Sequence, residues 1–390
     1  MAYYRSTPPS SQQTFYREQE NIDFHINLQK DEAVEMGSVR LEGRVTTYVT
    51  GSTAVTANTR LYYDNYVGSQ ALTSQLTVVF DKFGTLENNM NYPRYVKHHA
   101  VATLAPESLG TQTDNSVELR VATQAMTKGM LEGQFTRDLS LPFSNRLYCC
   151  LNDASDDIPS ALTGNIMIRI RTPPTNQWVF GEDYVAGTNY KLEDIMLTYN
   201  VVKAVPLKAP LILKVTNSAP SVAIASTQVN ISQSSPGLSN AVSLSFISQE
   251  RQNDAGSYNY LAMMPPPGKP PVGAGISGGS ETDTGHYGVE RCTYAVNDTD
   301  TALVGFTFES REEIAANGLR VFGEGTRTYS ALIRNYSDPD QPDCYLMGMP
   351  FGKYIDFSST KFGLELQTQC TQQDQYQAYL FFHSAIQIYG

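Results

Sequence analysis

The sequence of 390 residues is poor in cysteine, in tryptophan and in charge. It has five cysteines, a single tryptophan and only 17% charged residues. The cysteine count is odd and no pair has the C-x-x-C spacing of zinc and redox sites, so we expect free thiols, buried in a reducing compartment. The cysteines are Cys149, Cys150, Cys292, Cys344 and Cys370. We expect adjacent Cys149 and Cys150 to point to opposite faces of a strand, which excludes joint binding of one metal.

Long hydrophobic runs are also absent. No stretch approaches the ~20 apolar residues that cross a bilayer. The N-terminal segment MAYYRSTPPSSQQTFYREQE has no apolar core of the kind a signal peptide needs. We therefore expect synthesis in a cytosol-like space.

Positive charge is scarce. There are 28 Lys and Arg residues against 39 Asp and Glu, which gives a formal net charge of −11. Such a surface repels phosphate backbones and anionic membranes, so extensive nucleic-acid binding is not expected, and membrane contact would need a local patch. Arg169 and Arg171 share one face of a predicted strand, but two charges do not make a nucleic-acid track.

The sequence contains no recognisable catalytic constellation. Neither a G-x-S-x-G nor an H-E-x-x-H motif occurs. His25 and His383 fall on predicted strands, where an interior or interstrand role is favoured over catalysis. His98 and His99 are neighbours on a predicted helix and do not face each other, which argues against a two-histidine metal site. We expect no catalytic, cofactor-binding or metal-binding residues, and hence not an enzyme.

Two acidic clusters are candidate calcium sites, because oxygen-rich loops can bind Ca²⁺. The clusters are Asp153, Asp156 and Asp157, and Asp338, Asp340 and Asp343. Neither has the spacing or the glycine of an EF-hand loop, and prolines lie beside both, so ordinary turn chemistry is favoured. Calcium at a subunit contact stays open as an alternative.

The sequence is rich in tyrosine and phenylalanine, with 24 and 16 residues, and its apolar residues alternate with polar ones. Alternation with a period of two predicts strands. The predicted strands span residues 22–28, 39–47, 72–80, 117–122, 138–143, 165–171 and 195–202. Only short helices are predicted, at 95–104 and 312–319. Closely spaced strands without long amphipathic helices favour antiparallel sandwiches over a parallel sheet.

The closing pattern of the first half recurs in the second. An apolar residue followed by Pro-Phe precedes two alternating strands in both halves. In the first half these segments are 141–143, 165–171 and 192–202; in the second they are 349–351, 362–368 and 379–388. An ordered repeat of this kind predicts two tandem units of the same architecture.

We therefore predict an all-β chain of two tandem antiparallel jelly-roll sandwiches with a few short helices. The first jelly roll is predicted at 21–205 and the second at 206–390. Residues 1–20 are polar and are predicted to form a flexible arm. The Pro- and Gly-rich segment 263–288 is predicted to be a long surface loop.

The order of these segments resembles that of double jelly-roll major capsid proteins of small DNA viruses, such as polinton-like viruses and virophages. The resemblance lies in residues 22–45, 72–104, 138–172, 190–202, 344–368 and 379–390. Segments 22–45 and 72–104 resemble that family's opening strands and short-helix passage, and 138–172 with 190–202 resemble its closing strands. Residues 206–330 depart most from the pattern, and no single motif is diagnostic.

The resemblance implies a homotrimer that forms a pseudo-hexagonal capsomer and assembles, inside the host cell, into the icosahedral shell of a virion. It implies neighbouring capsomers, penton proteins and minor capsid proteins as partners, with an inner membrane or a host receptor as further contacts. The arm at 1–20 is the candidate for inner or neighbour contacts. It implies no cofactor and no catalysis.

Two other functions remain open at this point. Jelly rolls also serve as glycan-binding domains, as in a viral fibre or a lectin, although the single Trp178 and the lack of a signal peptide weigh against that function. A penton or minor capsid protein is the other alternative, which normally needs only one jelly roll.

Overall fold

The computed structural model describes most of the chain. The described residues are 2–49, 67–103, 139–175, 178–179, 188–224, 226, 228–248, 252–253, 262–263, 288–297, 303–309, 311–323, 347–368 and 376–389. The predicted strand at 117–122, Cys344, Cys370, His286, the cluster Asp338, Asp340 and Asp343, and nearly all of the predicted loop 263–288 lie outside these ranges.

Two sheets face each other in the first half of the chain. One contains β1 (Tyr3–Thr7), β2 (Phe15–Tyr16), β4 (Glu32–Val34), β5 (Arg40–Val49), β8 (Leu139–Arg146), β9 (Ile158–Pro159) and β11 (Thr188–Lys203). The other contains β3 (Asn21–Ile26), β6 (Gln75–Phe80), β7 (Gly84–Asn89) and β10 (Ile166–Arg171). The first has the order β8-β5-β11-β4-β9, with β1 and β2 paired to β11, and the second has the order β3-β10-β6-β7.

The second half forms another pair of sheets. One contains β12 (Leu211–Ser218), β13 (Val222–Ile224), β15 (Leu238–Ser248), β19 (Met347–Asp356) and β21 (Tyr376–Ile388). The other contains β14 (Gln228–Gln233), β16 (Ala262–Met263), β17 (Gly288–Asn297), β18 (Leu303–Phe308) and β20 (Lys361–Thr368). Their orders are β12-β21-β15-β19, with β13 on β21, and β14-β20-β17-β16, with β18 on β17.

The two halves have the same topology, and this makes the fold a double jelly roll. In the first half, the last strand, β11, lies between β5, which pairs with β8, and the early strands β1, β2 and β4. In the second half, the last strand, β21, lies between β15, which pairs with β19, and the early strands β12 and β13. Each half also has a helix after its β7 or β18 strand: α1 (Tyr92–Thr103) in the first and α5 (Arg311–Arg320) in the second. Two shorter elements, η1 (Gly68–Leu72) and α3 (Ser160–Thr163), complete the first half.

The predicted repeat is confirmed by this correspondence. The two Pro-Phe segments lie in β8 and β19, and the strands that follow them are β10 with β11 and β20 with β21. Both predicted helices are present as α1 and α5. The boundary near residue 205 stays a prediction about folding units; the connection between the jelly rolls runs from β11, which ends at Lys203, to Leu211 of β12.

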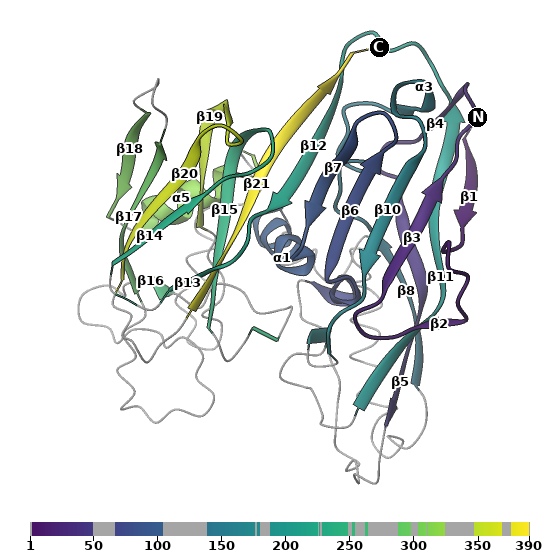
Figure 1. Cartoon of the computed structure of the whole chain (residues 1–390), viewed down its shortest axis with the longest axis horizontal. Helices are drawn as coiled ribbons and strands as arrows, with labels where there is room; N and C mark the ends of the chain where they lie inside the picture. Colours follow the sequence, from purple (N-terminus) through teal and green to yellow (C-terminus); the bar gives the residue numbers. More distant parts are fainter. Residues whose placement is uncertain are drawn as a thin grey trace.

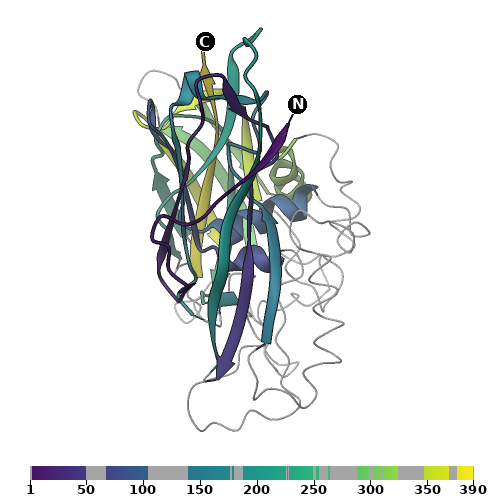
Figure 2. The ribbon, with the colours of Figure 1, turned by 90° about the vertical axis from the view of Figure 1, so that its right-hand side faces the viewer.

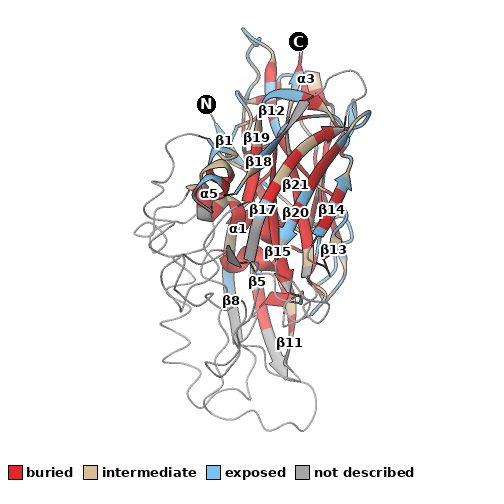
Figure 3. Cartoon of the chain, turned by 90° about the vertical axis from the view of Figure 1, so that its left-hand side faces the viewer, coloured by how far each residue is buried: buried red, intermediate tan, exposed pale blue. Residues whose placement is uncertain are grey.

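Alternation along the strands explains how each sandwich forms. In β10, Ile166, Ile168 and Ile170 are fully buried, whereas Arg169 and Arg171 are exposed. Because strand side chains alternate between faces, one face of each sheet is apolar and covers the other sheet. Figure 3 shows these buried faces running along the strands of both sandwiches.

The two jelly rolls stand side by side with α1 between them (Figure 1), and both chain ends lie at the same end of the molecule (Figures 1 and 2). One apolar cluster fills the second jelly roll alone. The other fills the first and continues across the joint into β12 and β21, through residues such as Leu213 and Phe381.

Two sequence predictions need correction. Residues 1–20 do not form a flexible arm in the described part of this segment: Tyr3–Thr7 pairs with Leu197–Val201 and Phe15–Tyr16 pairs with Leu192–Glu193. The edge of β11 pairs with both strands, and Tyr16 enters the core of the first jelly roll. Cys149 and Cys150 lie in a turn after β8 and not on opposite faces of a strand. Both thiols and that of Cys292 are free and buried, as predicted.

Candidate functional site

The most distinctive site of this chain is the joint between its jelly rolls. The joint is formed by β7 and α1 of the first jelly roll and by the outer face of the sheet containing β12, β21 and β15 of the second. Aromatic rings meet across it: the ring of Tyr95 lies 5.9 Å from those of Phe381 and His383. The ring of His98 lies 5.0 Å from that of Phe381, nearly perpendicular to it.

Polar groups fix the register of β7 against β12. The amide of Asn88 donates to Asn217 Oδ1 at 2.8 Å, and the amide of Met90 donates to Ser218 Oγ at 2.7 Å. In the opposite direction, the amide of Thr216 donates to Glu87 Oε1 at 3.1 Å. Two main-chain bonds also cross the joint, from Ser155 N to the Ile212 carbonyl at 2.8 Å and from Lys214 N to the Asp153 carbonyl at 3.1 Å. They form only an isolated bridge, so the sheets of the two jelly rolls stay separate.

Glu87 lies fully buried at the centre of this docking. Its second carboxyl oxygen accepts a hydrogen bond from the amide of Cys150 at 2.8 Å. Burial raises the pKa of Glu87 from 4.5 to about 8, although the amides of Cys150 and Thr216 act in the opposite direction. The carboxyl group is therefore mostly protonated at neutral pH.

Three histidines also lie in the joint. Ser243 Oγ of β15 is 3.1 Å from His98 Nδ1 and 2.8 Å from His383 Nε2, so the serine hydroxyl links α1 to β21. Burial holds the pKa of His98 well below its usual range and lowers that of His383 to about 3. The pKa of His99 is lowered to about 4 for the same reason. All three rings are neutral at pH 7.

Arg94 brings a permanent charge into the joint. Its side chain is 1% exposed, and its guanidinium carbon lies 4.9 Å from the ring of Trp178 and 4.1 Å from the ring of Tyr379. It also donates to Asn91 Oδ1 and to the carbonyl of Gln252. Cation–π contact with desolvated rings supports a buried guanidinium, so Arg94 binds residues of both jelly rolls together.

Strands β5 and β11 hold, in the first jelly roll, the positions of β15 and β21 in the second. Their outer face is thus equivalent to the sheet face that α1 covers, and it has no partner within the described part of the chain. This face carries Met196, which is 36% exposed, and Tyr4, which is 62% exposed and donates to Glu42. The counterpart of β7 is β18, where Phe306 is 47% exposed. The counterpart of α1 is α5, which packs against β19 of its own jelly roll.

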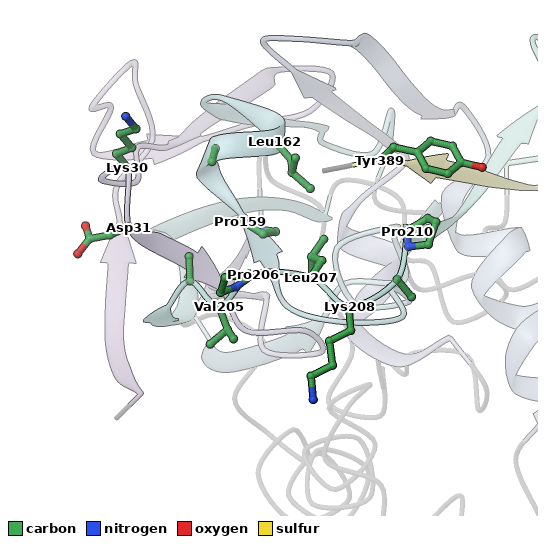
Figure 4. Close-up of a pocket in the computed structure, with 13 residues that line it drawn as sticks. Lys30, Asp31, Pro159, Leu162, Val205, Pro206, Leu207, Lys208, Pro210 and Tyr389 are labelled. Atoms are coloured by element: carbon green, nitrogen blue, oxygen red, sulfur yellow. The ribbon is translucent and has the colours of Figure 1, made fainter.

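A recess lies beside the connection between the jelly rolls (Figure 4). Residues 204–210 cross this end of the molecule, and a cavity of about 570 Å³ beside them is lined by apolar groups that include Pro159, Leu162 and Tyr389. Lys30 and Asp31, which carry opposite charges, lie at one side of it (Figure 4). This mixed lining does not define the chemistry of a ligand.

The residues that the sequence singled out as possible metal-binding or charged sites form ordinary structural contacts. Asp156 accepts from the amide of the next residue, Asp157, as expected of turn chemistry, whereas Asp157 accepts from the amide of the distant residue Met36. Within the described ranges, no three His, Cys, Asp or Glu side chains are grouped so that they could hold a metal, and no helix is long and apolar enough to span a bilayer. His25 lies exposed on β3, and Arg169 pairs with Asp23 at 2.7 Å.

Sequence reasoning missed Glu87 and Arg94. It assigned neither residue to an element, because the predicted strand ended at residue 80 and the predicted helix began at residue 95, whereas β7 spans Gly84–Asn89 and α1 begins at Tyr92. A charged residue near such amphipathic elements is also normally taken to face solvent. A second amphipathic surface packs against that face here, and only the tertiary arrangement reveals it.

No family model matches the chain, and no curated protein matches its sequence. Solved structures do match its fold over nearly its whole length. The major capsid protein of Faustovirus aligns with a TM-score of 0.59 at 8% identity, over 100% of this chain and 90% of that one. The capsid of PBCV-1 gives 0.56 at 10% identity, over 100% and 94%. The Sputnik virophage structure gives 0.52 at 10% identity, over 99% and 85%.

Proposed function

We propose that this protein is a major capsid protein, which forms a homotrimeric, pseudo-hexagonal capsomer and assembles into the icosahedral shell of a virion. Similarity of fold to viral capsid proteins supports this function. At identities of 8–10% that similarity speaks for fold alone, so the proposal depends on the surfaces of the chain itself. The protein acts by assembly, without catalytic turnover.

The observation that carries the proposal is the joint between the jelly rolls. It is heterologous, because two different surfaces meet: β7 with α1 on one side, and the sheet face of β21 and β15 on the other. Among the described residues, strand β18, the counterpart of β7, and the outer face of β5 and β11, the counterpart of the β21 and β15 face, lie uncovered at opposite sides of the molecule. When the same kind of contact is repeated head to tail between copies, the result is a closed ring or an open helix.

A ring of three copies would contain six jelly rolls in equivalent contacts. In that ring, β18 of one copy lies on the outer face of β5 and β11 of the next, so Phe306 faces Met196 and Tyr4 of a neighbour. Stable contacts of this kind bury ~1,600 Å² or more. Penton and minor capsid proteins would complete the shell, and an acidic chain leaves extensive genome contacts to other components.

The first test is the mass of the purified protein. Light scattering should give three times the chain mass of 43.1 kDa, and negative-stain images should show hexagonal outlines. Placing a charge at the centre of an apolar contact should break it, so Phe306→Asp is expected to give monomers with unchanged far-UV circular dichroism. Phe83→Asp is the matched control, because Phe83 is equally exposed, at 48%, but lies in a turn outside these surfaces. A wild-type protein that stays monomeric at high concentration would contradict the proposal.

A further inference from the structure

The three histidines of the joint come from both jelly rolls. His98 and His99 belong to α1, and His383 belongs to β21. The ring of Phe322, which follows α5, lies 5.7 Å from the ring of His99 and 5.0 Å from that of His383. The Tyr148 ring lies 4.8 Å from His99. The imidazoles thus sit among aromatic rings at the contact between the two units.

The geometry around Ser243 disfavours protonation of both neighbouring rings. A hydroxyl group has one proton, so Ser243 Oγ donates to one imidazole nitrogen while it accepts from the other. If both His98 and His383 were protonated, both nitrogens would be donors, and two positive charges would flank one hydroxyl oxygen. The present arrangement thus depends on at least one neutral ring.

Charged groups near the rings mostly oppose protonation. Arg94 and Lys97, on the same helix, and His383, from the facing strand, lower the pKa of His98. Arg146 and Lys214 lower that of His99, whereas Asp153 raises it. For His383 the nearby charge is that of His99, which also lowers its pKa. Burial is the largest cause in all three cases.

We propose that the joint is acid-sensitive: protonation of His98, His99 and His383 separates α1 from the sheet of β21 and β15 while both jelly rolls stay folded. The inference goes beyond the proposed function. In a capsomer, the same event would loosen the shell protein from within when the surroundings become acidic.

A histidine whose pKa is lower in the closed joint than in water stabilises the closed state fully above about pH 6.5. This stabilisation is lost progressively as the pH falls from about 6.5 toward the pKa in the closed joint, which is about 4 for His99 and about 3 for His383. Between pH 7.5 and 5.0, each histidine freed by opening shifts the opening equilibrium roughly thirty-fold, and three shift it roughly 10⁴-fold.

Among the described residues of the joint, Glu87 is the buried group whose titration opposes that of the histidines in this pH interval. Its pKa of about 8 means that acid stabilises the closed joint wherever opening exposes this carboxyl. Over the same pH interval this effect is on the order of a hundredfold, so the histidines still dominate and the net shift is at least about a hundredfold toward opening.

Hydrogen exchange on the full-length protein tests the proposal. After correction for intrinsic rates, the amides of Asn88, Met90 and Thr216, which donate across the joint, should exchange at least about a hundredfold more readily at pH 5.0 than at pH 7.5 relative to those of β10. The double variant His98→Asn with His383→Gln retains polar atoms near Ser243 but does not titrate. In this variant acid should produce no gain in exchange at these amides, because the one remaining histidine contributes roughly thirty-fold and Glu87 opposes it by on the order of a hundredfold.

His25→Gln is the matched control, because His25 is an exposed histidine on β3, and it should keep the wild-type response. If the double variant does not fold, His383→Gln alone should reduce the response roughly thirty-fold. Equal acid responses in wild type and variants, or none in the wild type, would overturn the proposal. The mass of each sample is measured in parallel, so failure to form trimers is recognised separately from failure of the acid response.

Discussion

At the scale of single residues, the joint is unusual in how much polarity it buries. Arg94 keeps its charge between two aromatic rings, whereas Glu87 lies where its charged form is disfavoured. Unpaired buried charges are costly, but a protonated carboxyl that accepts bonds from two amides is tolerated. The joint is therefore specified by hydrogen-bond geometry as well as by apolar contact.

Glu87 gives a stability prediction at this scale. Because its folded pKa of about 8 exceeds its unfolded value of 4.5, its contribution is fully present below pH 4.5 and is lost as the pH rises toward 8. Between pH 6.5 and 8 the wild type should lose roughly 1.5 kcal/mol of unfolding free energy through this group. Urea unfolding should show this loss to be absent in Glu87→Gln, whatever the variant's absolute stability. Glu309→Gln, an exposed position, should behave as wild type.

At the scale of elements, helix α5 and the residues after it lie close against β19. A Cβ at Gly348 would lie 2.6 Å from the carbonyl oxygen of Val242 and 2.8 Å from Val321 Cγ2. The first of these is main chain in the neighbouring strand and cannot move without disturbing the sheet. The glycine thus permits α5 to reach the outer face of the sheet beside the joint.

Gly348→Ala should therefore destabilise the protein by about 1–3 kcal/mol, the usual cost of overpacking. Gly43→Ala on β5 is the informative comparison, because its Cβ would come closest, at 2.5 Å, to the end of the flexible Ile195 side chain. Thermal unfolding should rank Gly348→Ala clearly below Gly43→Ala. The opposite ranking would mean that β19 shifts freely and that α5 is not held by this contact.

At the scale of the whole molecule, the two jelly rolls share one apolar cluster. Leu211, Leu213, Val215 and Phe381 of the second half are buried with residues of the first. Separation of the halves would expose this surface and the polar groups that bond across it. Each jelly roll has the topology of an independent domain, but the two are packed against each other through this shared apolar cluster.

Residues 1–205 and 206–390 expressed separately should consequently aggregate or expose apolar surface to a dye, because contiguous apolar patches of this kind are rare on soluble monomers. Co-expression should recover a soluble complex that elutes together in size-exclusion chromatography. Two soluble, monomeric halves that do not associate would show that the joint contributes little to stability.

The sequence by itself determined the class of this fold and much of its order. Alternating residues such as Ile166, Ile168 and Ile170 predict a strand with one buried face, because strand side chains point to opposite sides in turn. The repeated Pro-Phe segments predicted two units of one topology. These signals involve residues close together in the sequence, so they can be recognised without knowledge of the tertiary contacts.

Only the tertiary structure decided which polar residues are buried and where the N-terminal segment lies. Tyr3–Thr7 has a polar sequence, yet the free edge of β11 pairs with it. Glu87 and His98 occupy ordinary positions on amphipathic elements and become buried because a second jelly roll covers their outer faces. Burial of this kind depends on contacts between residues more than a hundred positions apart, such as Glu87 with Thr216. No local pattern records such contacts.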